Sequence, residues 1–403
     1  MRIMHKDNHR ERLHTSVAHD PYDARHHGSI HIPIYQTSLF SFDTYERFTQ
    51  AHANEQQRHV YSRGNNPTVR YLEDKLAELE GAEMSKCFAS GMAAISSTIL
   101  SNVKAGDHVV CIDQAYGPTR HFLQHYVARF QVETTFVDGR SLEAIEAALQ
   151  PNTKLLYLES PSTMLFQLQD LAACAALARS RGIVTVIDGT WATPVFQRPL
   201  ALGIDLVVHS ITKYISGQSD SMGGVVSGSK ELVGRIAEGE YMMLGGIMTA
   251  HTAAQVERGL RTLPLRLERH ERSGLKVAEH LLRQPYVLRV NHPGLPSHPQ
   301  HELAKRQMDG TSGLFSFESS ESHETMRSWA DRLRYFKIGV SWGGFESLVS
   351  ANPTSADHGV PGARSLVRLH IGLESPDDLI PDLDEAWAQT AAAEAAAVGR
   401  SGQ

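Results

Sequence analysis

The sequence predicts an α/β protein in which a large domain with a mostly parallel sheet precedes a smaller α/β domain. In the first part of the chain, short and nearly continuous apolar segments of strand length alternate with segments of helical periodicity. Such strands are typical of a parallel sheet that helices cover on both faces. After about residue 250 the pattern changes to long Arg- and Leu-rich helical stretches mixed with further short strands.

The elements of the large domain follow from this alternation. Apolar residues at helical spacing predict a helix over residues 69–79, which Gly81 ends. Before it, the first 60 residues show little periodicity, so we expect an extended arm that packs on something else. After it, we expect strands over residues 108–112, 154–158, 183–187 and 205–209, and helices over residues 141–149 and 170–180.

The last third of the chain predicts the small domain. Residues 249–283 form a helical stretch that is interrupted around Pro264, and strands are expected over residues 287–290, 313–317 and 367–371. The Ala- and Gly-rich tail is expected to fray over residues 391–403. We therefore divide the chain into an arm (1–60), a large domain (61–258) and a small domain (259–403).

Composition excludes several classes of protein. With 39 Lys and Arg against 45 Asp and Glu in 403 residues, the net charge is −6, and no basic excess favours a nucleic-acid partner. No apolar run approaches the roughly 20 residues of a membrane span, and we expect no signal peptide. The three cysteines (Cys87, Cys111, Cys174) form no CxxC motif, which favours the cytoplasm. The 22 histidines lack metal-ligand spacing, so no metal is expected.

Polar residues end four of the expected strands, namely Asp113, Glu159, Asp188 and Ser210. In open parallel sheets the ligand lies beyond the carboxyl ends of the strands. The four residues therefore indicate one site at that edge. The alternative is that each is simply a polar residue at the start of a loop.

A lysine, Lys213, follows the last of these strands in the segment Val-Val-His-Ser-Ile-Thr-Lys-Tyr. A desolvated lysine can have a lowered pKa and form a Schiff base. The hydroxyls of Ser210 and Thr212 are suited to bind a phosphate beside it. Asp188 could keep a pyridine nitrogen protonated, as a pyridoxal ring requires to act as an electron sink. From this segment alone, a surface lysine beside a turn is the alternative.

Two further segments suit a phosphorylated ring. Gly91 and Met92 follow Ser90 at a predicted helix start, where backbone N–H groups can reach a phosphate, although a simple helix cap is the alternative. Tyr116 precedes the turn Gly117-Pro118 and could stack on a ring, or serve in packing alone.

Together these motifs resemble the trans-sulfuration enzymes, the pyridoxal-phosphate (PLP) enzymes of cysteine and methionine metabolism. The resemblance extends from about residue 29 to residue 388. Its matching segments are Tyr61-Ser62-Arg63 with Asn66-Pro67-Thr68, Ser90-Gly91-Met92, Tyr116-Gly117, Glu159-Ser160-Pro161-Ser162, Asp188 with Thr190, Ser210 to Tyr214, Ser341 with Gly343 to Leu348, and Arg368 with Gly372-Leu373-Glu374.

The resemblance implies an aspartate-aminotransferase-like fold (PLP fold type I) with PLP as cofactor. It implies that Lys213 is the Schiff-base lysine and proton carrier, and that Tyr116 stacks on the cofactor and assists proton transfer. The residues that it implies for cofactor binding are Asp188 at the ring nitrogen and Gly91, Met92, Ser210 and Thr212 at the phosphate.

The family also implies contributions from a partner and from the small domain. Tyr61 and Arg63 reach the phosphate of the neighbouring subunit, so catalytic dimers are expected to assemble into a homotetramer. Arg368, helped by Ser341, holds the α-carboxylate of a small amino-acid substrate in the bidentate way that arginine allows. A structural ion pair is the alternative role for Arg368.

Some positions depart from the family pattern or divide its branches. Gly189 stands where Asn is common, Gln218 where His is common, and Thr163 near a usual Asn. Trp191 and Trp342 lie in motifs that are similar to those of bacterial cystathionine β-lyases. Val340 is similar to the residue of methionine γ-lyase at this position. The γ-acting cystathionine enzymes tend to have Glu there, and the β-lyases tend to have Tyr.

The resemblance thus predicts a PLP-dependent lyase of EC 4.4.1 type that performs β- or γ-elimination on an amino acid such as cystathionine or methionine. Lys213 would remove the α-proton. The alternatives are γ-elimination of an oxygen-linked substrate such as canavanine, a γ-replacement synthase, and a catalytically silent PLP-binding regulatory protein.

Overall fold

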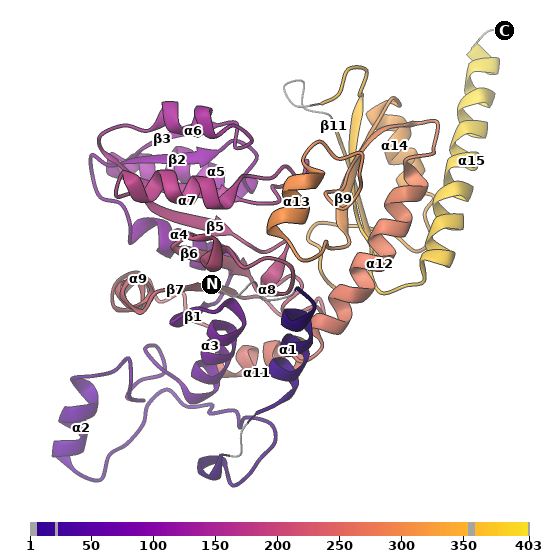
Figure 1. Cartoon of the computed structure of the whole chain (residues 1–403). Coiled ribbons are helices and arrows are strands. Elements are labelled where there is room, and N and C mark those ends of the chain that lie inside the picture. Colours follow the sequence, from indigo (N-terminus) through magenta and orange to yellow (C-terminus); the bar gives the residue numbers. More distant parts are fainter. Residues whose placement is uncertain (1–5, 21–22, 354–358, 402–403) are drawn as a thin grey trace. The chain divides into compact units, whose positions relative to one another are not determined.

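The computed structural model describes residues 6–20, 23–353 and 359–401. The chain divides into two compact units, which Figure 1 shows coloured along the sequence. The first unit comprises Met1–Thr163, Gln167–Pro264 and Gln307–Asp309, and the second comprises Met164–Phe166, Leu265–Arg306 and Gly310–Gln403. No helix in the described ranges is long and apolar enough to cross a membrane.

A seven-stranded sheet forms the centre of the first unit, with strand order β1-β7-β6-β5-β4-β2-β3. The five strands from β6 to β3 run parallel, and β7 pairs antiparallel with β6 and with β1. This confirms the predicted mostly parallel sheet. The strands are β1 (Met84–Phe88), β2 (His108–Ile112), β3 (Glu133–Val137), β4 (Thr153–Glu159), β5 (Val184–Asp188), β6 (Leu206–Ser210) and β7 (Gly224–Gly228).

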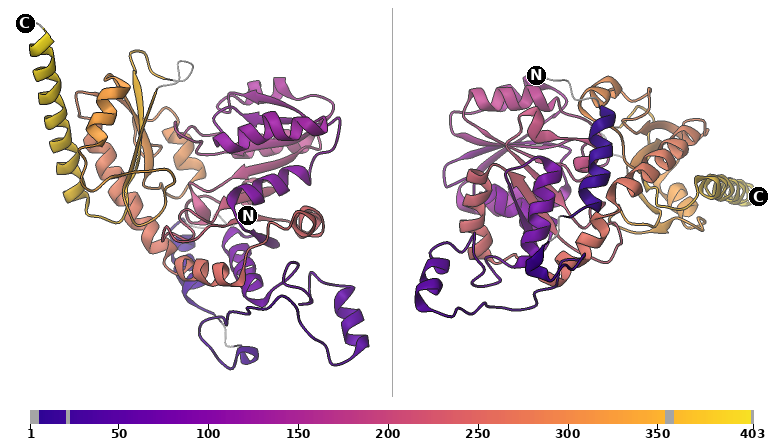
Figure 2. Two further views of the ribbon diagram at one scale, coloured as in Figure 1. Left: turned by 180° about the vertical axis from the view of Figure 1, so that it is seen from behind. Right: turned by 60° about the horizontal axis from the view of Figure 1, so that its bottom comes forward.

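Helices cover both faces of this sheet (Figures 1 and 2). The three helices predicted for this part of the chain are confirmed as α3, α6 and α7, and side chains of Asn66, Ser141 and Asp170 cap their N-termini. The helices are α1 (Lys6–Ala18), α2 (Tyr45–His52), α3 (Pro67–Glu80), α4 (Gly91–Leu100), α5 (Gly117–His121), α6 (Leu142–Ala148), α7 (Leu171–Ser180), α8 (Thr193–Phe196), α9 (Lys230–Ile236), α10 (Met242–Leu244) and α11 (Ala250–Leu260).

The N-terminal arm is only partly extended, because it also contains α1 and α2. The prediction of an extended arm is wrong for these two segments. Among residues 11–18, the part of α1 whose burial the structure describes, Leu13 and Val17 are buried one helical turn apart, and two apolar residues give too weak a period to detect. The hydroxyl of Thr44 caps α2 by accepting a hydrogen bond from the Arg47 N–H at 3.2 Å.

A five-stranded sheet with order β10-β11-β12-β9-β8 forms the second unit, and Trp329 is fully buried in its core. The Ala-rich tail expected to fray continues α15 as far as Ser401, because alanine favours the helix most strongly. The elements are β8 (Val287–Asn291), β9 (Leu314–Ser319), β10 (Lys337–Ile338), β11 (Leu348–Pro353), β12 (Ser365–His370), α12 (Leu263–Leu281, from Leu265 onwards in this unit), α13 (His301–Gln307, as far as Arg306), α14 (His323–Ala330) and α15 (Pro376–Ser401).

A close backbone approach joins β7 to the start of α4. A Cβ atom on Gly224 would overlap the carbonyl oxygen of Ser90, and it would lie 2.9 Å from the Cα of Gly91. Neither neighbour is a flexible side chain that could move away. Glycine at position 224 therefore allows the N-terminus of α4 to lie directly against the central sheet.

We predict that Gly224→Ala destabilises the protein by about 1–3 kcal/mol, the usual cost of overpacking a core. Chemical denaturation monitored by circular dichroism measures this change. The matched control is Gly234→Ala within α9, where an added Cβ meets only the Gln56 side chain at 4.0 Å. The control should be neutral or slightly stabilising, and equal stability of the two variants would contradict the close approach.

Candidate active site

The carboxyl ends of β4, β5 and β6 meet at one edge of the large sheet. Glu159 and Asp188 are directly paired in the β4–β5 register, and Asp188 is paired with Val208 in β6, two residues before Ser210. Asp113 follows β2 at the same edge, where its N–H donates to the carbonyl of Val137 at 2.8 Å. The sequence prediction that these strand ends share one edge is confirmed.

Asp188 is held by hydrogen bonds from the turn that follows β5. Its Oδ1 accepts from the N–H of Thr190 at 3.0 Å and also from the Thr190 hydroxyl. The same hydroxyl oxygen accepts from the N–H of Ser210 at 2.8 Å, which links β5 to the end of β6. Burial raises the pKa of Asp188, while the Thr190 hydrogen bonds and the charges of His209 and Lys213 lower it in part.

Glu159 lies beside Asp188 and shares its buried environment. Its Oε2 accepts from the backbone N–H of Tyr116 at 2.6 Å, and Thr163 hydrogen-bonds to the same carboxylate. Burial and the neighbouring Asp188 carboxylate raise the pKa of Glu159 well above its usual range. Two adjacent buried carboxylates form a site that a cation would stabilise.

The start of α4 and the segment after β6 form the other side of this edge. Ser90 caps α4 by accepting from the Ala93 N–H at 3.1 Å. A Cβ on Gly91 would lie 2.9 Å from both Cβ and Oγ of Ser210, so only glycine lets these two backbones approach so closely. The Thr212 hydroxyl accepts from the Gly223 N–H at 3.1 Å, which fixes the turn that precedes Lys213.

These residues fit a PLP molecule. The N-terminus of α4 with the nearby Ser210 and Thr212 hydroxyls suits a phosphate, because backbone N–H groups at a helix start favour an anion. Asp188, raised in pKa by burial yet held by two hydrogen bonds, suits a pyridinium nitrogen. Lys213 lies three residues beyond Ser210, and its backbone N–H donates to the Ser210 carbonyl at 3.2 Å.

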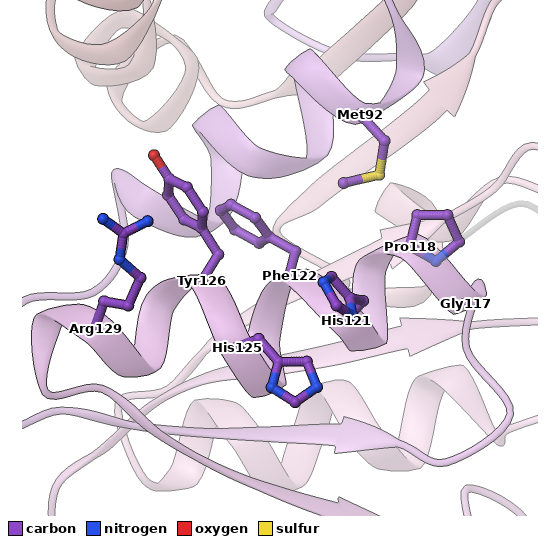
Figure 3. Close-up of a pocket in the computed structure, with 8 residues that line it drawn as sticks. All are labelled: Met92, Gly117, Pro118, His121, Phe122, His125, Tyr126 and Arg129. Atoms are coloured by element: carbon purple, nitrogen blue, oxygen red, sulfur yellow. The ribbon is translucent and has the colours of Figure 1, made fainter.

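A hollow of about 600 Å³ lies between the start of α4 and the helical segment that follows Tyr116. Figure 3 shows Met92, from the start of α4, opposite Phe122 and His121 on the helical segment that follows Tyr116. Tyr126 and Arg129 lie further along the same wall. Sequence reasoning singled out Met92 and the turn Gly117-Pro118 of this lining but missed the aromatic and imidazole side chains, which form no recognised motif.

Tyr61 and Arg63 are exposed on the surface of the first unit. Tyr61 is 45% accessible, and the guanidinium carbon of Arg63 lies 5.5 Å from the centre of the Tyr61 ring. Their segment is tied to the arm by a bridge between Leu39 and Tyr61 and by the Ser62 N–H, which donates to Ser38 at 2.9 Å.

Arg368 and Ser341 lie together in the second unit. Arg368 occupies the middle of β12, and its guanidinium Nη2 donates to the Ser341 carbonyl at 3.3 Å. Ser341 has a left-handed backbone with φ of 76°, a conformation that costs about 1–3 kcal/mol in a residue other than glycine. The Gly343 N–H donates to the ring of His370 at 3.1 Å and so holds the following turn against β12.

The structure gives a physical reason for one departure from the family pattern. A Cβ on Gly189 would lie 2.8 Å from Cε1 of His209 and 3.1 Å from Cγ1 of Val207. His209 is buried, and its Nε2 is 2.5 Å from the Glu80 carboxylate. The imidazole thus fills the space that a larger residue at position 189 would require.

Sequence reasoning missed two buried side-chain pairs behind the site, Glu80 with His209 and Glu73 with Lys86. A detectable signal exists for both carboxylates. Glu73 and Glu80 lie two helical turns apart on the same face of α3 as the buried Leu76. An acidic residue in an apolar stripe indicates a buried cationic or hydrogen-bonding partner.

The fold and this edge together define a PLP-dependent enzyme of fold type I. Residues 14–388 match the family described as Cys/Met metabolism PLP-dependent enzyme, and the chain belongs to this family. The predicted family, fold class and cofactor are thereby confirmed. Within the described residues, no group of three or more His, Cys, Asp or Glu side chains is arranged to hold a metal ion.

Named relatives specify the reaction class. The chain is 41% identical to L-methionine gamma-lyase of Pseudomonas putida over 394 residues, which covers 95% of this chain and 99% of that protein. It is 39% identical to cystathionine gamma-lyase of Macaca fascicularis, covering 84% and 86% of the two chains. It is 38% identical to a putative cystathionine beta-lyase of Rhizobium johnstonii, covering 94% and 96%. The chain is therefore a PLP-dependent lyase, as predicted.

We predict that Glu159→Gln stabilises the cofactor-free protein at pH 8 but not at pH 4. The raised pKa means that the folded state holds a proton that the unfolded state has lost above the ordinary value of 4.5. Wild-type stability therefore falls as the pH rises above about 4.5, and glutamine removes this penalty while its amide oxygen still accepts from Tyr116. Melting temperatures measured from pH 4 to pH 8 test this, and a constant difference between the proteins would contradict it.

Proposed function

We propose that this protein catalyses the PLP-dependent γ-elimination of methionine and related thioethers. The overall reaction converts methionine and water into 2-oxobutyrate, methanethiol and ammonia. The observation that supports methionine as the substrate is the 41% identity with a methionine γ-lyase along nearly the full length of both chains. Val340 supports it, since an apolar side chain there offers no polar group to the distal amine of cystathionine.

When bound, PLP supplies an electron sink that stabilises the negative charge left at Cα after the proton departs. We assign the proton movements to this chain's own residues. The Lys213 amine would hold the cofactor, and as a free amine it would take the α-proton of the bound substrate. In γ-elimination Lys213 would also accept the second proton, which leaves Cβ. Tyr116 would assist these proton transfers.

Asp188, Arg368 and Ser341 bind and orient in this proposal. Asp188 keeps the cofactor ring nitrogen protonated, which the Thr190 hydrogen bonds support by fixing the carboxylate. Arg368 binds the substrate α-carboxylate with its planar fork, and the Ser341 carbonyl that accepts from Arg368 holds the guanidinium in place. Gly91, Met92, Ser210 and Thr212 bind the phosphate.

The second candidate is β-elimination of cystathionine, which with water gives homocysteine as the leaving group, pyruvate and ammonia. Trp191 and Trp342 favour it, because both lie in motifs similar to those of bacterial cystathionine β-lyases. Similarity to the putative cystathionine beta-lyase over 94% of this chain supports it further. The oxygen-linked substrates and the γ-replacement reaction use the same residues, so product analysis distinguishes them.

We also propose that the enzyme works as a dimer of catalytic dimers in the cytoplasm. In each catalytic dimer, Tyr61 and Arg63 would complete the phosphate site of the neighbouring subunit. Their exposure on the surface of a single chain supports a role between subunits.

The function is tested by assaying the holoenzyme with methionine, cystathionine, canavanine and O-acetylhomoserine. We expect 2-oxobutyrate and methanethiol from methionine, and Lys213→Ala should abolish both while the protein stays folded. Pyruvate from cystathionine as the main product would favour the second candidate. A protein that binds PLP but consumes none of these amino acids would contradict the proposed reaction.

The shared site predicts complementation between two inactive variants. A mixed dimer of Arg63→Ala and Lys213→Ala contains one site with both residues intact. Random exchange should therefore restore up to about a quarter of the wild-type activity, since half of the dimers are mixed. Subunit exchange is verified with differently tagged chains, and no recovery despite exchange would assign Tyr61 and Arg63 to their own subunit or to no site.

A further inference from the structure

A buried lysine on the central sheet contacts the segment that bears Tyr61 and Arg63. The Nζ atom of Lys86, on β1, donates to the carbonyl oxygen of Gly64 at 3.0 Å. Gly64 directly follows Arg63, and the N–H groups of Gly64 and Asn65 both donate to the Tyr61 carbonyl, at 3.0 and 3.3 Å. Residues 61–65 thus form a compact turn, and the Lys86 ammonium binds the turn at its end.

The charge of Lys86 is balanced within the core by Glu73. Nζ lies 3.2 Å from Oε1 and 3.3 Å from Oε2 of this carboxylate, which belongs to α3 and is 1% accessible. The Glu73 carboxylate also accepts a hydrogen bond from the Cys87 N–H at 3.0 Å. Lys86 also lies 4.5 Å from the centre of the Tyr241 ring, in the geometry of a cation–π contact.

An interior ammonium is costly to bury, and this one has three partners that together replace its water shell. A leucine or methionine at position 86 would fill the same space without that cost. The feature that an apolar residue could not reproduce is the hydrogen bond to Gly64. Through this hydrogen bond Lys86 contacts a residue outside the core.

Lys86 is the β1 side chain that hydrogen-bonds to this turn, while other hydrogen bonds join the turn to the arm and to Asn66 at the N-cap of α3. Ser62 Oγ donates to the Thr37 carbonyl at 2.5 Å, and the Asn65 amide donates to the Gln56 carbonyl at 3.0 Å. Both partners belong to the arm itself. These contacts define the shape of the turn, whereas Lys86 fixes its position relative to the large sheet.

We infer that Lys86 is a positioning residue, which holds the turn so that Tyr61 and Arg63 are presented in a fixed place to the phosphate site of a second copy of this chain. This inference rests on the proposed shared site. It does not make Lys86 a catalytic residue, because Lys86 acts only through Gly64. Glu73 serves the same purpose indirectly by balancing the Lys86 charge.

The test replaces the pair together, as Glu73→Gln with Lys86→Met, because Lys86→Met alone would leave a buried carboxylate without its cation. Glutamine can still accept from the Cys87 N–H. The matched control is Ser85→Ala with Ser227→Ala, which removes a buried hydroxyl pair 2.7 Å apart at the neighbouring position of β1. All variants are checked for folding by circular dichroism.

Two readouts are needed. Amide hydrogen exchange over residues 61–65 of the cofactor-free protein should be faster in the Glu73/Lys86 variant and unchanged in the control. The dissociation constant for PLP should rise roughly tenfold in the same variant, which is about 1.4 kcal/mol of binding free energy, and stay at the wild-type value in the control. Adding Arg63→Ala to the Glu73/Lys86 variant should weaken PLP binding no further than Arg63→Ala does alone.

The outcomes separate this inference from the proposed function. Wild-type exchange over residues 61–65 in the Glu73/Lys86 variant would overturn the anchoring role. So would fully additive effects of that variant and Arg63→Ala, since they would show that Lys86 acts on cofactor binding without Arg63. Unchanged PLP affinity in Arg63→Ala alone would instead reject the shared site, and with it the purpose assigned to the anchor.

Discussion

Two buried carboxylates at one edge of a parallel sheet are the constraint on which this structure depends. Glu159 and Asp188 end adjacent strands in register, so their charges cannot move apart without breaking the sheet. Burial and mutual repulsion favour their protonated forms. The hydrogen bonds from Tyr116, Thr163 and Thr190 oppose this effect in part, as do the charges of His209 and Lys213 at Asp188. The edge is therefore suited to a cationic ligand, and a protonated pyridine ring meets that need.

The surroundings of this edge hold the other reacting groups close to it. Gly91 and Gly224 let the start of α4 approach β6 and β7 at backbone distance, which brings an anion-binding helix terminus beside Ser210. The exposed turn at Tyr61 and Arg63 is tied to the same sheet through Lys86. Rigid elements thus position both the cofactor's expected phosphate site and the residues assigned to the partner's phosphate.

Much of this was predictable from the sequence, because its strongest signals are periodic. The helix α3 with its Gly81 stop and the strands that end in Glu159, Asp188 and Ser210 appear as patterns of apolar residues. The motif around Lys213, taken together with the other motifs that resemble the family, indicated PLP chemistry. The missed features depend on contacts between distant residues: nothing near Gly64 in the sequence indicates Lys86 as its partner. Within residues 11–18 of α1, for which burial is described, Leu13 and Val17 are buried, and two side chains are too few to show a period. Likewise, the sequence does not show that His209 lies against Gly189 and leaves no room for a larger residue there.

The most direct measurement compares PLP with its 1-deaza analogue, in which carbon replaces the ring nitrogen. Both compounds offer the same phosphate and aldehyde, so they differ only towards the residue that faces the ring nitrogen. If Asp188 binds a pyridinium, PLP will raise the melting temperature of the cofactor-free protein markedly more than the analogue, and Asp188→Asn will reduce the difference. Equal stabilisation of the wild-type protein by the two compounds would contradict the assignment of Asp188 to the ring nitrogen.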